Sequence, residues 1–117
     1  DNAYVQYDIY HAQRMEGELA ATMEAQLGRI GHIQIADTPG RHEPGSGEIN
    51  FPFLFAHLDR IGYTGWIGCE HKPATTTEAG LDWRPRLALG PARPSSRPCR
   101  RRSCCPISAP VPRITPC

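Results

Sequence analysis

Hydrophobic and polar residues alternate along three short segments of the chain, at residues 4–10, 30–36 and 66–70. Because successive side chains of a strand point to opposite faces, this period of two predicts three β-strands. In each segment the polar face ends in a side chain with an oxygen that can bind a metal: Asp8, Gln34 and Glu70. We therefore predict a sheet with an aliphatic face for helices and a polar inner face, as in a parallel α/β barrel.

A helical pattern fills the first interval between these segments. Residues 16–29 are rich in Ala, Glu, Leu and Met, and Leu19, Met23 and Leu27 are spaced by four. This spacing predicts one helix with an apolar stripe that faces the sheet.

The second interval begins with a loop. Residues 37–50 contain two Pro-Gly pairs, which favour turns over regular structure, and loops at strand ends often carry function. Asn50 is a suitable N-cap for a helix over residues 51–61, and Gly62 is suited to end it. A weaker helical segment follows at residues 78–83. The order β-α-β-α-β-α predicts parallel strands with an active site at their carboxyl ends.

Composition divides the chain into two parts. Residues 84–117 hold 8 of the 12 prolines, 4 of the 5 cysteines and 8 arginines, and they contain no Asp or Glu. Residues 1–83 carry a formal charge of −7 and the remainder +8, so the net charge of +1 is an average of two unlike segments. We expect residues 1–83 to form part of a barrel domain and residues 84–117 to be a disordered or frame-shifted tail.

The sequence also restricts the partners and the compartment. No apolar run approaches the roughly 18 residues of a membrane helix, and no secretion signal is recognisable. Cys69, the one cysteine before the tail, is expected in a buried strand, so we predict a cytoplasmic protein. Arginine-rich tails can bind nucleic acid, but the irregular, proline-rich context of these arginines does not favour nucleic-acid binding. The four cysteines of the tail do not have the spacing of a zinc motif. The absence of an initiating Met suggests a chain that starts partway through a larger protein.

Five motifs resemble the C-terminal part of the hydroxypyruvate isomerase family, one of the xylose isomerase-like barrels. They stand at residues 7–11 (YDIYH), 31–37 (GHIQIAD), 39–45 (PGRHEPG), 47–51 (GEINF) and 62–70 (GYTGWIGCE). Their order and spacing match the family over nearly all of residues 3–83. The resemblance implies that the chain contains the last three βα units of an eight-stranded TIM barrel.

The resemblance also implies a metal site. In this family four consecutive strand ends bind one divalent cation, and Asp8, Gln34 and Glu70 match the last three ligands; the first, a glutamate, belongs to a preceding strand. Carboxylate and amide oxygens are hard ligands, so Mg²⁺ or Mn²⁺ is expected. Glu70 would also be one of two glutamates that move a proton between adjacent carbons, through an enediolate, as hydroxypyruvate and tartronate semialdehyde interconvert.

Three further residues are candidates for substrate binding. His11 resembles the substrate-contacting histidine of the family. Arg41, in the loop after the second strand, could pair with a substrate carboxylate through its planar guanidinium. His32 shares the inward face with Gln34 and could line the floor of the site. His71 departs from the aromatic residue expected after Glu70, which leaves the choice of substrate open.

Other interpretations of the same residues stay open. Asp8 and Glu70 could be strand-end caps or solvated carboxylates, and Gln34 could be a hydrogen-bonded core group. A ketose 3-epimerase is the alternative enzyme, although such epimerases typically have His at the position of Gln34. A third possibility is a non-catalytic remnant that is unfolded or depends on association with the missing part. We expect these 117 residues alone, as an incomplete fragment, to bind metal weakly and to show no isomerase turnover.

Overall fold

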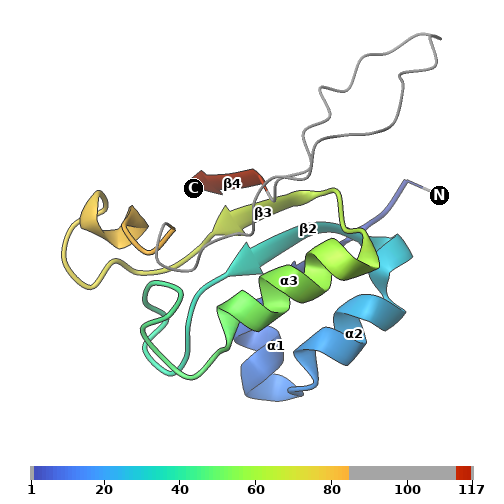
Figure 1. The fold of residues 1–117 in the computed structure, drawn as a ribbon, viewed down its shortest axis with the longest axis horizontal. Helices are drawn as coiled ribbons and strands as arrows, with labels where there is room; N and C mark the ends of the chain where they lie inside the picture. The colour runs from blue at the N-terminus through green and yellow to red at the C-terminus, as the bar shows by residue number, and fades with distance from the viewer. Residues whose placement is uncertain (1, 85–112, 117) are drawn as a thin grey trace, which may run out of the picture.

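A four-stranded parallel sheet forms one layer of the structure and three helices form the other (Figure 1). The structure is a computed structural model that describes residues 2–84 and the backbone of residues 113–116. The strand order is β1-β2-β3-β4, and the helices α1 to α3 all cover the same face of the sheet. The predicted βα order and parallel strands are therefore confirmed for the three strands before residue 84.

The first strand is shorter than predicted. β1 spans Val5–Asp8, and α1 begins at once, over Ile9–Met15, where the alternation had suggested that the strand continues to residue 10. The reason is local, because the Asp8 side chain accepts hydrogen bonds from the backbone N–H groups of Tyr10 and His11 and so caps α1. Ile9 and Tyr10 are consequently buried by the helix.

The helix predicted over residues 16–29 is also divided. The structure has α2 over Leu19–Ala25 and a short 3₁₀ helix, η1, over Leu27–Arg29. Gly17 and Glu18 both have positive φ angles, of 70° and 50°, which reverse the chain between α1 and α2. Leu19 and Met23 are buried as the apolar stripe predicts.

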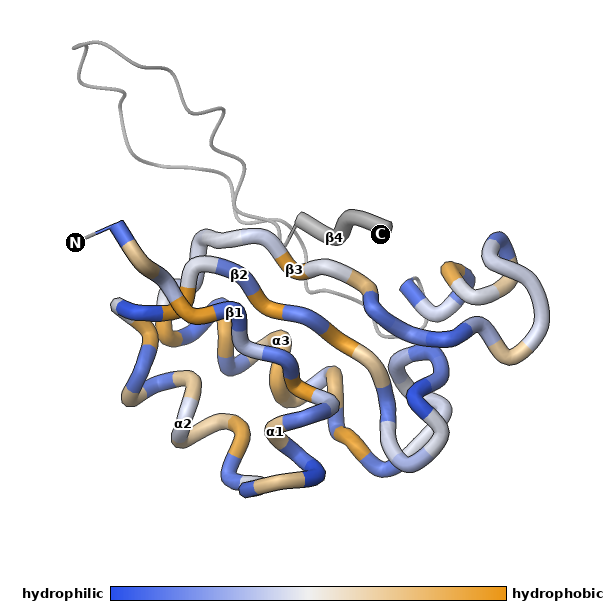
Figure 2. The backbone as a smooth tube through the Cα atoms, turned by 180° about the vertical axis from the view of Figure 1, so that it is seen from behind, coloured by the Kyte–Doolittle hydropathy of each residue, from blue (hydrophilic) through white to orange (hydrophobic). Residues whose placement is uncertain are grey.

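The second and third strands match their predictions closely. β2 spans Ile30–Ile35 and β3 spans Trp66–Cys69. β2 lies between β1 and β3 and pairs in parallel with both. Along β2, apolar and polar residues alternate (Figure 2), and Ile33 and Ile35 are fully buried against the helices. The alternation of apolar and polar residues along β2 thus correctly predicts which residues face the helices.

The helix that connects β2 and β3 has the predicted bounds. α3 spans Phe51–Ile61; the Asn50 side chain accepts a hydrogen bond of 3.2 Å from the Phe53 N–H, and Gly62 ends the helix with a φ of 80°. Phe51, Leu54, Phe55 and Leu58 face the core. The core lies between the sheet and the three helices, and its members are Ile9, Leu19, Met23, Ile30, Ile33, Ile35, Ile49, Phe51, Leu54, Phe55, Leu58, Ile67, Cys69 and Trp83.

The end of the chain differs from the prediction in two places. Residues 78–83 form only a 3₁₀ turn, η2, over Ala79–Leu81. Most of the predicted disordered tail lies outside the described residues, but Arg113–Pro116 form β4, which pairs in parallel with β3. This strand is an addition to the predicted elements, and the edge of β3 offers unpaired backbone groups to it. The disordered or frame-shifted tail stays a prediction.

No helix within the part of the chain that the structure describes is long and apolar enough to cross a membrane. The cytoplasmic location stays a prediction.

Candidate active site

The carboxyl ends of β1, β2 and β3 bring together the three predicted metal ligands. In the sheet register Asp8 is the partner of Gln34, and Gln34 is the partner of Gly68. Glu70 follows β3 directly, and its N–H donates a hydrogen bond of 3.0 Å to the carbonyl oxygen of Ile35. The parallel register therefore places Asp8, Gln34 and Glu70 on three adjacent chain segments at one edge of the sheet.

Asp8 performs two structural tasks at this edge. Its Oδ1 accepts hydrogen bonds from the backbone N–H of Tyr10 (2.9 Å) and of His11 (3.3 Å). Its Oδ2 lies 3.6 Å from Nε2 of His11, whose side chain is 57% exposed. Partial burial raises the pKa of Asp8, and a hydrogen bond shared with the Glu70 carboxyl also raises it, against the opposing effect of His11. The Glu70 carboxyl therefore lies near enough to Asp8 to affect its pKa.

Gln34 lies on β2 between the two carboxylates. Its Oε1 accepts a hydrogen bond of 2.6 Å from Nε2 of Gln6, on the same polar face of β1. This bond orients the amide, and the oxygen keeps a second lone pair for another partner. The interpretation of Gln34 as a hydrogen-bonded group and its interpretation as a ligand are therefore compatible.

Glu70 forms an ion pair with Arg41. The distance from Arg41 Nη2 to Glu70 Oε2 is 2.8 Å, and the two side chains are 26% and 42% exposed. Arg41 also lies over the ring of Tyr10, with 5.2 Å from Cζ to the ring centroid. The sequence had indicated Arg41 as a partner for a substrate carboxylate; the structure shows that its guanidinium reaches the Glu70 end of the site.

His32 lies against the backbone of β3. A Cβ atom built on Gly68 would be 2.9 Å from Nε2 of His32, closer than side chains tolerate, so the absence of a side chain at Gly68 makes room for the imidazole. The predicted inward direction of His32 is consistent with this contact. His32 therefore lies across the polar face, over a residue two positions before Glu70.

Gly68→Ala is expected to displace the His32 imidazole while leaving the fold intact. The added methyl group would meet the end of a side chain that can rotate, so the free energy of unfolding should fall by only about 1 kcal/mol. The measurement is the change in the His32 ring resonances by NMR, with a urea titration alongside. An unchanged His32 signal in the variant would contradict the packing described above.

A hollow of about 340 Å³ adjoins the ion pair. It is lined by Arg41, Cys69, Glu70, His71 and Lys72. Lys72 was not among the predicted site residues, although it is the only lysine in the sequence and follows Glu70 by two positions. Arg41 and Lys72 bring two cationic side chains to one hollow, which suits an anionic ligand.

Asp37 is a second residue that the sequence pattern did not single out. It is 1% exposed, and backbone N–H groups of the following loop donate to its carboxylate. An Asp that precedes a loop rich in Pro and Gly was the available signal.

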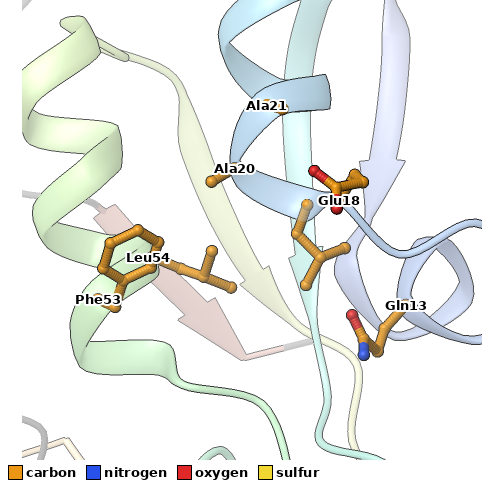
Figure 3. A pocket seen from close by; sticks show the side chains of 7 residues that line it. Gln13, Glu18, Ala20, Ala21, Phe53 and Leu54 are labelled. Atoms are coloured by element: carbon orange, nitrogen blue, oxygen red, sulfur yellow. The ribbon is translucent and has the colours of Figure 1, made fainter.

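A second hollow, of about 240 Å³, lies between the helices (Figure 3). Its lining residues belong to α1, α2, α3 and the turn before α2: Gln13, Glu18, Leu19, Ala20, Ala21, Phe53 and Leu54. None of the predicted site residues lines it, so it is not part of the candidate active site.

The donor set at the strand ends suits a hard divalent cation in its chemistry. Asp8 and Glu70 supply two interacting carboxylates, and Gln34 supplies an amide oxygen between them. Within residues 2–84 no group of three or more Asp, Glu, His or Cys side chains is placed so that it could hold a metal ion.

The family of the chain follows from a comparison with known proteins. The family model described as "Xylose isomerase-like TIM barrel" matches residues 1–87. The chain belongs to this family.

Individual relatives have more specific names. Hydroxypyruvate isomerase of Escherichia coli strain K12 is 61% identical over 82 residues, which are 70% of this chain and 32% of that protein. A 2-oxo-tetronate isomerase of Pectobacterium atrosepticum is 57% identical over 82 residues, 70% of this chain and 31% of that protein. The chain thus spans about a third of the length of the curated relatives that it matches.

Solved structures support the same fold. A protein described as AP endonuclease, family 2, from Brucella melitensis superposes with a TM-score of 0.68 at 51% identity, over 70% of this chain and 32% of that one. A 3-keto-D-glucoside 4-epimerase from E. coli gives a TM-score of 0.64 at 30% identity, over 71% of this chain and 33% of that one. The prediction of a partial xylose isomerase-like barrel is confirmed.

Proposed function

We propose that this chain supplies three βα units of an isomerase that interconverts hydroxypyruvate and tartronate semialdehyde, or a closely related 2-oxo acid. The observation that carries the proposal is the placement of Asp8, Gln34 and Glu70 on adjacent segments at the carboxyl edge of the sheet, with Arg41 paired to Glu70. The names of the relatives, hydroxypyruvate isomerase and 2-oxo-tetronate isomerase, support an oxo-acid substrate.

Each residue has a proposed task. Glu70 removes a proton from a substrate carbon and gives a proton back. The ion pair with Arg41 uses Oε2 of Glu70, so the other carboxylate oxygen, Oε1, stays outside the ion pair. Arg41 and Lys72 attract the substrate carboxylate to the hollow beside Glu70. His11, three residues after Asp8, and His32, within β2, approach the substrate from the polar side of the sheet.

A divalent cation, Mg²⁺ or Mn²⁺, is the proposed cofactor. Asp8, Gln34 and Glu70 would hold it, together with groups outside this chain. When bound, it supplies positive charge that stabilises negative charge on the substrate oxygens. A cation would also favour the ionised form of Asp8, whose pKa is raised by burial and by the Glu70 carboxyl.

The test is a chimeric enzyme. Residues 1–83 replace the matching segment of E. coli hydroxypyruvate isomerase, whose identity over this stretch is 61%. The chimera is expected to turn over hydroxypyruvate within about tenfold of the parent rate. Dialysis against a chelator should abolish turnover, and Mg²⁺ or Mn²⁺ should restore it.

Each alternative predicts a different result from the same assay. A folded chimera that acts only on free ketoses would instead identify a 3-epimerase segment. A folded chimera that acts on neither class of substrate would identify a non-catalytic remnant. Either result overturns the proposal.

A further inference from the structure

The Asp37 carboxylate is buried at the start of the loop between β2 and α3, and four backbone N–H groups surround it. Its Oδ1 accepts hydrogen bonds from Thr38 (2.9 Å) and Ile49 (3.0 Å). Its Oδ2 accepts from Gly45 (2.8 Å) and Gly47 (2.9 Å). Each carboxylate oxygen therefore has two donors, and the charge is satisfied entirely by the loop that follows.

These bonds join both ends of the loop to one point. Thr38 lies at the start of the loop, Gly45 and Gly47 lie in its second half, and Ile49 lies just before α3. A Cβ atom at Gly47 would collide with the carbonyl oxygen of Thr38, so the loop closes on itself too tightly for a side chain there. The hydrogen bonds to Asp37 thus stabilise a segment that has few apolar side chains to bury.

The same loop holds Arg41 in an unusual backbone conformation. Arg41 has a φ angle of 60°, in the left-handed region that few residues other than glycine adopt. The carbonyl groups of Arg41 and of the next residue both accept hydrogen bonds: the N–H of Lys72 donates to the carbonyl oxygen of Arg41 (2.7 Å), and the N–H of Asp37 donates to that of His42 (3.0 Å). In this conformation the guanidinium reaches Oε2 of Glu70 at 2.8 Å.

We propose that Asp37 is a positioning residue, whose carboxylate holds the loop of residues 38–49 in the shape that presents Arg41 to Glu70. The consequence for catalysis rests on the proposed function, whereas the positioning itself does not. Asp37 is only 1% exposed and its two oxygens already have four donors, so it does not itself contact a substrate. It acts through Arg41.

The experiment uses the full chain, labelled with ¹⁵N, and the variant Asp37→Asn. An amide group has the same shape, but its NH₂ would face two N–H donors and release part of the loop. Amide exchange at Gly45 and Gly47 is expected to accelerate at least tenfold, and rotation about the Arg41 Cζ–Nη bonds should also accelerate at least tenfold. The amides of β2 and β3 should keep their exchange rates within about twofold. Asp59→Asn, at an exposed position on α3, is the matched control and should change neither readout.

Arg41→Gln tests whether Arg41 instead holds the loop, in a variant that keeps the Asp37 carboxylate. If Asp37 positions Arg41, and not the reverse, the Gly45 and Gly47 amides should keep their exchange rates within about twofold in this variant. A tenfold acceleration there would overturn the proposal, as would an Asp37→Asn chain that loosens the loop while Arg41 rotation stays slow. Neither readout involves a substrate, so a failure of the proposed isomerase activity leaves this result unaffected.

Discussion

In the chimeric isomerase, Glu70→Gln is expected to lower kcat for hydroxypyruvate by about 10³-fold, with little change in KM. An amide keeps the shape of the side chain and can still meet Arg41, but it cannot accept the substrate proton at neutral pH. A 10³-fold loss corresponds to about 4 kcal/mol in the activation free energy, within the range that one general base contributes. Steady-state kinetics with hydroxypyruvate measure the effect.

Glu78→Gln provides the control for this prediction. Glu78 is exposed and its side chain makes no capping hydrogen bond with η2, so its variant should retain kcat within about twofold. A Glu70→Gln enzyme with kcat near the parent value would remove Glu70 from the proton transfer. A loss confined to KM would assign it to binding alone.

Phe51→Ala in the full chain is expected to lower the free energy of unfolding by about 3–5 kcal/mol. The Phe51 side chain is fully buried and its ring lies 5.8 Å, centroid to centroid, from that of Phe55. It stands at the first position of α3, directly after the loop that Asp37 organises, so the cavity would weaken the contact between helix and sheet. Urea titration followed by circular dichroism measures the loss.

Phe53→Ala is the matched control, because it removes the same side chain from the same helix. Phe53 is 54% exposed and stacks on His57 with 6.1 Å between ring centroids. Its removal should cost about 1 kcal/mol or less. Equal losses in the two variants would contradict the placement of the core on the inner side of α3.

Several features of the fold follow from local rules and were predictable. The alternation of Ile33 and Ile35 with polar neighbours gives β2, and Asn50 and Gly62 give the bounds of α3. The division of the predicted helix over residues 16–29 was missed. The start of α2 at Leu19, later than predicted, was also missed, because it follows the positive φ angle of Glu18, which the sequence pattern does not indicate for a residue other than glycine.

The candidate site also has features that the sequence predicts and features that it does not. Asp8, Gln34 and Glu70 could be selected because each ends a predicted strand, and parallel strands carry their functional groups at that edge. Their metal-binding and catalytic roles stay predictions. Nothing local indicates that Asp8 also caps α1, because the same alternation continues into Ile9 and favours a longer strand.

The sequence by itself determined the order of the elements, the two faces of the sheet and the residues at its carboxyl edge, because periodicity and capping act over a few residues. Only the tertiary structure decided that Arg41 meets Glu70 across 29 positions, that His32 lies over Gly68 and that Asp37 gathers donors up to 12 residues away. These contacts depend on strand register and on the path of a loop without periodic structure. Their physical basis is the pairing of charges and backbone groups that only the folded chain brings together.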